Sequence, residues 1–342
     1  MRIAVLSCFY PFRGGIAQFN AALYAELGKT DIVGAFNFSR QYPNFLFPGK
    51  TQYVTPDDEA MPVESTAILD TANPFSWIKA AKKIRKWKPD VLIMRYWMSY
   101  FAPSLGFVAR HAGKGCKVIG ILDNVVPHEQ RFFDTPFIMR QHPLYSHFGE
   151  KLSRRKAEEA LGLKPGMKNI LFFGLIRQYK GLDILLEAFA GLDDSYQLII
   201  AGEPYGSFEP YQKIIDSIPG KDRIHIFPKY IKDSEVKDYF SAADVTVLPY
   251  RSATQSGISS VSYHFEVPMI VTDVGGLKST IGDTGTGIVA EKAEPDCIRR
   301  EIESYFAEPA TRQDCIERIQ KEKRRLSWSA FCTDLRTFAE KL

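Results

Sequence analysis

Cysteine is scarce in this sequence and follows no metal-binding or disulfide pattern. The chain has 342 residues and five cysteines, an odd number, scattered without a Cys-x-x-Cys spacing. They are Cys8, Cys116, Cys297, Cys315 and Cys332. Neither a zinc site nor a disulfide framework is therefore expected, and the thiols are expected to be reduced and mostly buried.

Long apolar runs are lacking as well. No run approaches the roughly 18 to 20 residues that span a bilayer. The opening MRIAVLSCFYPFRGG passes from a short apolar run into an aromatic and glycine-rich loop without a small-residue cleavage site, which predicts a first strand rather than a signal peptide. The expected location is the cytoplasm. A net charge of +4 gives nucleic-acid binding no support.

Short apolar runs alternate with segments of helical period along most of the chain. In the first half, strands are expected at 2–7, 32–38, 91–95 and 117–122, and helices at 17–27, 74–87 and 100–111. In the second half, strands are expected at 169–174, 197–202, 223–228, 245–249 and 269–273, and helices at 182–190, 211–217 and 233–242. Residues 40–70 show no clear hydrophobic period and are expected to form loops and short strands. Such alternation predicts α/β domains with parallel sheets covered on both faces.

The two halves repeat this scheme independently, which predicts two domains. The expected division is an N-terminal domain at 1–140, a second domain at 141–325, and a C-terminal helix at 326–342 that packs back toward the first domain. The connection after residue 122 is short for a sixth strand with its helices. Either the first domain is trimmed near 134–140, or residues are absent from the chain there.

One segment, 243–276, predicts an anion site. It reads as a strand, a polar turn, a helix that starts near Ser256 and Gly257, and a second strand. A helix N-terminus beyond the end of a parallel strand favours an anion, most often phosphate. Arg177 and Lys180 follow the first strand of the same domain, at the mouth of the same sheet. An isolated Arg-x-x-Lys is usually a solvated turn, but this position favours a cation pair for a diphosphate.

The motifs FGLIRQYKGLDILLEAF, AGEP, AADVTVLPYRSATQSG and MIVTDVGG, together with the amino-terminal YPFRGGIAQF, resemble retaining glycosyltransferase family four over most of the chain. The resemblance implies the GT-B fold, in which two Rossmann-like domains face each other across a cleft. It implies a nucleoside diphosphate sugar as co-substrate, held mainly by the second domain. No metal and no other cofactor is implied, in agreement with the lack of an Asp-x-Asp motif.

The resemblance also assigns residues. Arg177 and Lys180 would stabilise the donor diphosphate, and the Gly14-Gly15 loop would close over it from the first domain, because glycine lets the backbone approach phosphate closely. Members of the family commonly have a histidine that contacts the transferred sugar. His128 is the candidate here, although Asp123, at the end of the strand 117–122, is an alternative for that position.

The segment 243–276 departs from the family in one respect. Most members have two glutamates eight residues apart, one near the sugar and one on the ribose, and this chain has Thr254 and Ser262 at about those places. TQSG resembles a variant branch in which neutral side chains and the amides at Gly257 and Ile258 take over. Sugar hydroxyls would then be met by Thr254, Gln255 or backbone. Glu203 in AGEP is the nearest remaining acid, and a structural role is equally consistent with its place.

A basic segment at 77–88, WIKAAKKIRKWK, allows two interpretations. It can be a domain helix with one buried face and one solvated basic face, which is the more common case. It can also lie on an anionic membrane surface. The second interpretation fits the lipid-linked acceptors that family members often use.

The predicted function is therefore transfer of a hexosyl group from a nucleoside diphosphate sugar to the hydroxyl of a glycan or lipid-linked glycan, with retention of configuration. A GT-B sugar-nucleotide epimerase is one alternative, and a non-catalytic nucleotide-sugar-binding relative is another. A two-lobed small-molecule binding protein is a third. It would normally need export, so the lack of a predicted signal peptide and the Arg-x-x-Lys motif disfavour it.

Overall fold

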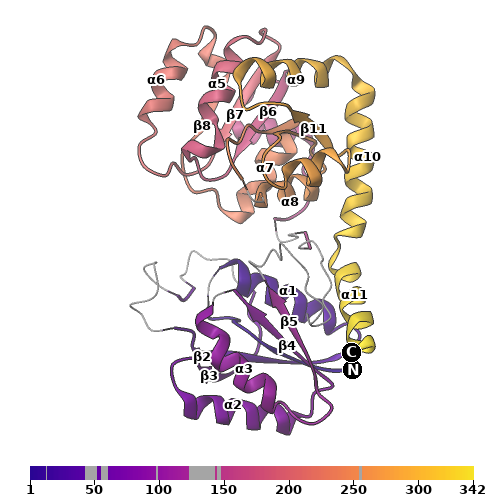
Figure 1. Ribbon diagram of the computed structural model, residues 1–342. Coiled ribbons are helices and arrows are strands. Elements are labelled where there is room, and N and C mark those ends of the chain that lie inside the picture. The colour runs from indigo at the N-terminus through magenta and orange to yellow at the C-terminus, as the bar shows by residue number, and fades with distance from the viewer. Residues whose placement is uncertain are drawn as a thin grey trace. The chain divides into compact units, whose positions relative to one another are not determined.

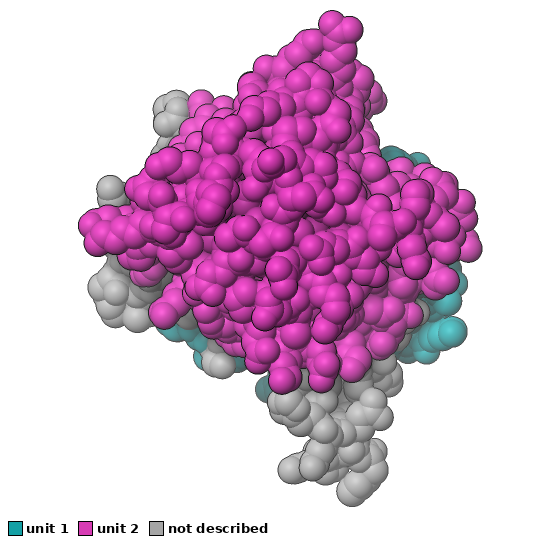
Figure 2. Space-filling model, turned by 90° about the horizontal axis from the view of Figure 1, so that it is seen from above, with its two compact units in different colours: residues 1–141, 328–342 teal, residues 142–327 magenta. Residues whose placement is uncertain are grey.

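The computed structural model describes residues 1–12, 14–42, 52–54, 61–97, 99–122, 143–144, 148–253 and 256–342. The chain forms two compact units, coloured separately in Figure 2: the first takes residues 1–141 and 328–342, and the second takes residues 142–327. His128 and Asp123 lie outside the described residues, as do Thr254 and Gln255.

The first unit has, within the described residues, a five-stranded parallel sheet in the order β3-β2-β1-β4-β5. Its elements are β1 (Arg2–Leu6), α1 (Gly15–Leu27), β2 (Ile32–Arg40), β3 (Thr66–Asp70), α2 (Pro74–Trp87), β4 (Val91–Tyr96), the 3₁₀ turn η2 (Ser99–Phe101), α3 (Ala102–His111), β5 (Lys117–Leu122) and α11 (Trp328–Lys341). Successive side chains of a strand point to opposite faces of the sheet, so β1 contributes residues to the cores on both faces. Leu6 packs in the core that includes α2 and α3, and Val5 in the core that includes α1 and α11. Helices cover both faces of the sheet (Figure 1).

The basic segment forms most of α2. The helix starts where the Asn73 side chain accepts a hydrogen bond of 3.0 Å from the amide of Phe75. Ile84 is buried, and Trp77 and Trp87 pack against the same core. The segment is therefore a domain helix with one buried face, and of its large apolar side chains only Ile78 is exposed.

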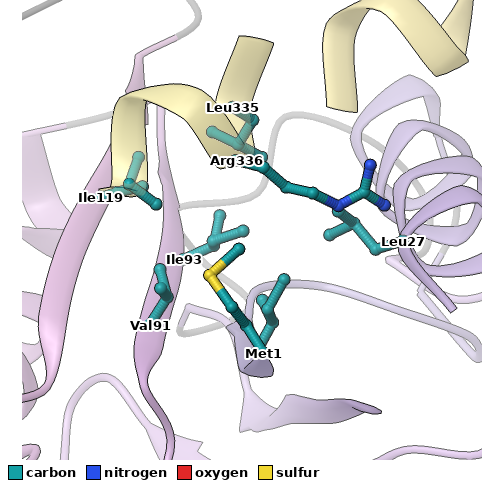
Figure 3. Close-up of a pocket in the computed structure, with 9 residues that line it drawn as sticks. Met1, Leu27, Val91, Ile93, Ile119, Leu335 and Arg336 are labelled. Carbon is teal, nitrogen blue, oxygen red and sulfur yellow. The ribbon is translucent and has the colours of Figure 1, made fainter. Parts of the chain in front are cut away.

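The last helix, α11, closes the first unit. Trp328 packs against Phe19 of α1 with ring centroids 4.8 Å apart. Arg336 Nε lies 2.7 Å from a carboxylate oxygen of Asp31, which also pairs with the amino group of Met1 at 2.8 Å. Figure 3 shows the apolar gap between α11 and the sheet. Its volume of about 10 Å³ is too small for a sugar or a nucleotide, so the gap is a packing defect.

The second unit has, in its described part, a six-stranded parallel sheet in the order β11-β10-β9-β6-β7-β8. Its elements are α4 (Arg154–Leu161), β6 (Lys168–Phe173), η3 (Gln178–Lys180), α5 (Leu182–Ala190), β7 (Tyr196–Ala201), α6 (Glu209–Ser217), η4 (Lys221–Arg223), β8 (Ile224–Phe227), α7 (Asp233–Ala242), β9 (Val245–Leu248), α8 (Gly257–His264), β10 (Met269–Thr272), the π-helical turn η5 (Lys278–Gly282), β11 (Gly287–Ala290), α9 (Pro295–Ala307) and α10 (Pro309–Arg325). Phe172 of β6 packs in a core with α5 and α9, and Phe173 packs in a core with α7 and α8.

The predicted α/β architecture is confirmed, with differences at particular elements. The helix expected at 100–111 begins as a 3₁₀ turn, and the helix expected at 211–217 starts earlier, at Glu209, because Pro210 fits the first helical turn. The segment 40–70 contains β3, and β11 and η5 had no predicted counterpart. No helix in the described ranges is long and apolar enough to cross a membrane.

Candidate functional site

The candidate site of the second unit lies at the carboxyl ends of β6 and β9. These strands are neighbours at the point where the strand order reverses: the chain leaves β6 toward β7 on one side and later returns to β9 on the other. Open α/β sheets bind their ligands outside the strand ends at such a point. The loop after β6 carries Arg177 and Lys180, and the loop after β9 leads into α8.

The loop after β6 is held against the loop after β7. Ile176 donates a backbone hydrogen bond of 2.9 Å to the carbonyl of Glu203, and Tyr205 donates one of 2.9 Å to the carbonyl of Ile176. The Arg177 guanidinium lies 4.6 Å from the centroid of the Tyr205 ring. Arg177 is exposed, so its guanidinium lies at the protein surface beyond the carboxyl end of β6.

Lys180 lies deeper than Arg177. Its side chain is buried, with the ammonium 5.6 Å from the centroid of the Tyr250 ring. A methyl group built on Gly174 would lie 3.2 Å from Lys180 Nζ and 3.0 Å from Cδ1 of Ile258, the second residue of α8. The ammonium therefore lies close to the first turn of that helix.

No carboxylate among the described residues pairs with Lys180. Burial, and secondarily the charge of Arg177, lower the pKa of Lys180 from 10.5 to about 8. A buried cation without a counter-charge costs free energy, which an anionic ligand would recover. This is the strongest sign of an anion site in the second unit.

The first turn of α8 offers hydrogen-bond donors to the same place. Ser256 is the N-cap residue, and its side chain makes no capping hydrogen bond. The Ser256 carbonyl accepts two hydrogen bonds from Ser259, one of 3.3 Å from its amide and one of 2.6 Å from its hydroxyl. Within the part of the chain that the structure describes, the amides of Gly257 and Ile258 have no acceptor. They are available to an anion.

Tyr250 forms a polar floor beside these groups. Burial raises its pKa to about 12, although a contact of 3.4 Å with the Ser256 hydroxyl acts in the opposite direction. The phenol is therefore neutral at physiological pH. Its ring can stabilise the Lys180 ammonium through a cation–π interaction, and the neutral phenol adds no negative charge to the site.

Two residues that the sequence singled out, Glu203 and Ser262, do not add a negative charge beside Lys180. Glu203 is exposed after β7, and its carbonyl, not its carboxylate, holds the loop that carries Arg177. Ser262 is buried, and its hydroxyl donates to Thr246 of β9 over 3.0 Å. It faces the sheet, and α8 carries no carboxylate at all.

The first unit presents the Gly14-Gly15 loop at the start of α1. Gly14 has φ of 104°, a conformation that favours glycine, and α1 has no side-chain cap. Asn20 holds the preceding loop by donating hydrogen bonds of 2.8 Å to the Ser7 hydroxyl and to the Cys8 carbonyl. The contact of Gly14 and Gly15 with a diphosphate stays a prediction.

Sequence reasoning did not predict the pair Arg251 and Asp183. Their side chains form two hydrogen bonds, of 2.9 and 2.6 Å, between the loop after β9 and the start of α5. The residues are 68 positions apart, so no local pattern reveals the pair. The one sequence signal for the pair is that each residue follows a predicted strand of the same sheet, Asp183 after β6 and Arg251 after β9.

Comparisons with known proteins point to one family. The Glycosyl transferases group 1 family matches residues 153–322, which include every described site residue of the second unit. A D-inositol 3-phosphate glycosyltransferase of Nocardiopsis dassonvillei is 28% identical over 194 residues, 54% of this chain and 45% of that protein. One from Mycolicibacterium gilvum is 29% identical over 163 residues, 46% of this chain and 36% of that protein. The chain thus spans less than half the length of these curated relatives.

Solved structures share the fold of the whole chain. A glycosyltransferase from Rickettsia africae has a TM-score of 0.68 at 14% identity and covers 99% of this chain and 98% of its own. Anabaena Alr3699/HepE in complex with UDP has a TM-score of 0.60 at 11% identity, with full coverage of both chains at 100%. At these identities the likeness concerns the fold alone. Residues 153–322 therefore match the Glycosyl transferases group 1 family, and the chain has the GT-B fold.

Proposed function

We propose that this protein transfers a hexosyl group from a nucleoside diphosphate sugar to an acceptor hydroxyl with retention of configuration. The observation that carries the proposal is the buried ammonium of Lys180, which pairs with no carboxylate among the described residues and lies beside the first turn of α8, where the Ser256 side chain forms no cap. A diphosphate supplies negative charge to this ammonium, and the exposed Arg177 adds a second cation. The UDP bound in the Anabaena structure supports a donor of this class.

In this proposal the second unit stabilises the leaving group. The bond between the anomeric carbon and the phosphate oxygen breaks, and negative charge develops on the diphosphate. Lys180, Arg177 and the amides of Gly257 and Ile258 interact most strongly with that charge, so they lower the barrier. The departing phosphate oxygen then accepts the acceptor's proton as the new bond forms on the same face of the sugar.

The residues proposed to contact the sugar come from the family resemblance. Asp123 or His128 is proposed to contact the sugar, with Thr254 and Gln255 on its hydroxyls. The relatives are named D-inositol 3-phosphate glycosyltransferases. For this chain we propose the hydroxyl of a glycan or lipid-linked glycan as the acceptor, with no metal or other cofactor required.

Thermal stabilisation by a panel of nucleotide sugars tests the proposal, because a ligand that binds only the folded state raises the melting temperature. At least one nucleoside diphosphate sugar is expected to stabilise the protein, and its diphosphate to be released faster when an acceptor is present. Release without any acceptor would favour a sugar-nucleotide epimerase. Binding without release on any acceptor pool would favour a non-catalytic relative.

Donor use is expected to decline at alkaline pH. Lys180 has a pKa of about 8 in the ligand-free protein, so it loses its charge as pH rises through that value, and kcat/KM for the donor should fall. Lys180→Arg keeps the cation and should move the fall to higher pH. Stability should change in the opposite direction: the unfolded lysine, with its pKa near 10.5, holds its proton longer, so this group's contribution to stability rises between pH 8 and 10.5. A wild-type profile that is flat from neutral pH to pH 10 would contradict the assignment.

We also propose that α2 contacts an anionic membrane surface, which suits a lipid-linked acceptor. Its outer side carries Phe75 and Ile78, which are 76% and 42% exposed, one turn apart. Exposed Lys79, Lys82 and Lys86 follow on the same side, at spacings of three, four and seven residues. Apolar side chains at one end of a basic, acid-free surface are what an interfacial helix needs.

Co-sedimentation with vesicles tests the α2 contact. Binding to phosphatidylglycerol-rich vesicles is expected to exceed binding to phosphatidylcholine vesicles and to weaken with salt. Lys82→Glu combined with Lys86→Glu should reduce it at least about tenfold, since each lysine near such a surface contributes about 1 kcal/mol. The exposed Lys213 of α6 provides the control, because Lys213→Glu leaves α2 unchanged. Equal binding to both kinds of vesicle would refute the contact.

A further inference from the structure

Arg251 links the two loops that carry the anion site. It lies three residues after the end of β9, and its Nη1 and Nη2 atoms donate to the two carboxylate oxygens of Asp183 over 2.9 and 2.6 Å. Nη1 also donates to the carbonyl of Gln178 over 2.9 Å. Gln178 begins η3, the turn that ends in Lys180. One guanidinium therefore holds the start of η3 and the start of α5 together.

Backbone contacts also hold the loop after β6 against the loop after β9. Arg251 donates its amide hydrogen to the carbonyl of Tyr179 over 2.7 Å. A methyl group built on Gly181 would lie 2.1 Å from the carbonyl oxygen of Pro249, so the two loops touch there without room for a side chain. The residues on both sides of Lys180 are thus bound to the segment that leads from β9 into α8.

We propose that Arg251 and Asp183 form a positioning pair that fixes Lys180 relative to the first turn of α8, so that both can hold one diphosphate. The proposal rests on the proposed function, because it assigns the pair to the same donor site. Neither residue needs to touch the ligand. A diphosphate bridges Lys180 and the α8 amides only when the distance between them is right, and small displacements of preorganised groups are costly in such sites.

The exposure and charge of the pair agree with positioning rather than stability. The side chains of Arg251 and Asp183 are 40% and 30% exposed, so the ion pair itself contributes little to the free energy of unfolding. Burial would raise the pKa of Asp183, but the hydrogen bonds and charge of Arg251 lower it, so the carboxylate stays ionised. The pair therefore persists across the pH range in which a transferase works.

If Arg251 had a different role, Asp183→Ala would change anion binding in the opposite direction. If Arg251 were itself a contact to the diphosphate, removing Asp183 would delete a negative charge and free the guanidinium, so Asp183→Ala would tighten anion binding. In a positioning pair the same substitution releases η3 and weakens binding. Arg251→Lys separates the roles further, because lysine keeps the charge but cannot form the two-bond fork.

Titration with inorganic diphosphate tests the pair without knowledge of the donor's base or sugar. We expect Asp183→Ala, Arg251→Ala and Arg251→Lys each to weaken binding about tenfold, and the double alanine variant to be no weaker than either single one. Lys164→Ala breaks an exposed ion pair of 2.6 Å with Asp222 and serves as the control, with unchanged binding expected. Melting temperatures of all variants should stay close to that of the wild type.

Three results would overturn the positioning role: tighter or unchanged binding in Asp183→Ala, unchanged binding in Arg251→Lys, or additive losses in the double variant. A loss of binding that merely follows a loss of folding would overturn it too, which the melting temperatures reveal. Lys180→Ala distinguishes a failure of the donor site from a failure of the positioning pair. If Lys180→Ala binds diphosphate as well as the wild type does, the proposed donor site itself fails, whereas weak binding there with normal binding in Asp183→Ala refutes the pair alone.

Discussion

Lys180→Met is expected to lower the turnover number by about 10² to 10³-fold at saturating donor, the usual loss when one preorganised donor to a developing negative charge is removed. The ammonium of Lys180 is buried beside the α8 amides, so its interaction with the leaving diphosphate is little screened by water. Arg177→Ala should cost less, because Arg177 is exposed and solvent screens its charge. Initial rates of nucleoside diphosphate release measure both effects.

The same variant should not destabilise the protein, which separates its catalytic effect from a folding defect. Methionine keeps most of the length and packing of lysine but removes a charge that burial disfavours, as the lowered pKa of Lys180 shows. We therefore expect an unchanged or slightly higher melting temperature. Lys213→Ala, on the exposed side of α6, controls for the loss of a lysine and should leave turnover unchanged. Near-normal turnover in Lys180→Met would refute the assignment of Lys180 to the leaving group.

The elements that the sequence predicts well are those with strong local patterns. Runs such as ILFF in β6 and QLIIA in β7 are buried on both faces, and each is followed by a turn and a helix of clear period. Such runs predict a parallel sheet, and the parallel sheet in turn puts Arg177 and the start of α8 at one edge. The family resemblance, drawn from the same motifs, is supported at the coarser level of the Glycosyl transferases group 1 family, which matches residues 153–322, whereas the retaining mechanism and the TQSG variant stay predictions.

The features that escaped prediction depend on contacts between distant residues. Ser262 faces β9 because of the rotation of α8, which a short helix without charged residues does not reveal. Arg251 and Asp183 meet only after β6 and β9 become neighbours. The strand β11 and the turn η5 are short and contain glycines, so their patterns are too weak to predict an element.

Gly181→Ala is expected to destabilise the second unit by about 3 kcal/mol or more, through strain and a backbone clash together. Gly181 has φ of 69° and ψ of 32°, a left-handed conformation that costs other residues about 1 to 2 kcal/mol. A methyl group there would also lie 2.1 Å from the carbonyl oxygen of Pro249, which belongs to the backbone and cannot rotate away. The loop after β6 would have to separate from the loop after β9, so diphosphate binding should weaken as well.

Gly162→Ala is the control that has the backbone strain of Gly181→Ala without its steric clash. Gly162 ends α4 with φ of 65° and ψ of 31°, nearly the conformation of Gly181, but a methyl group on it would meet no atom within 4 Å. It should cost only the strain of about 1 to 2 kcal/mol and leave diphosphate binding unchanged. Urea denaturation of both variants, with diphosphate titration of the folded proteins, measures the difference. Equal losses of stability would show that the contact between Gly181 and Pro249 is not what joins the two loops. The placement of Lys180 would then depend on the side-chain and backbone hydrogen bonds of Arg251.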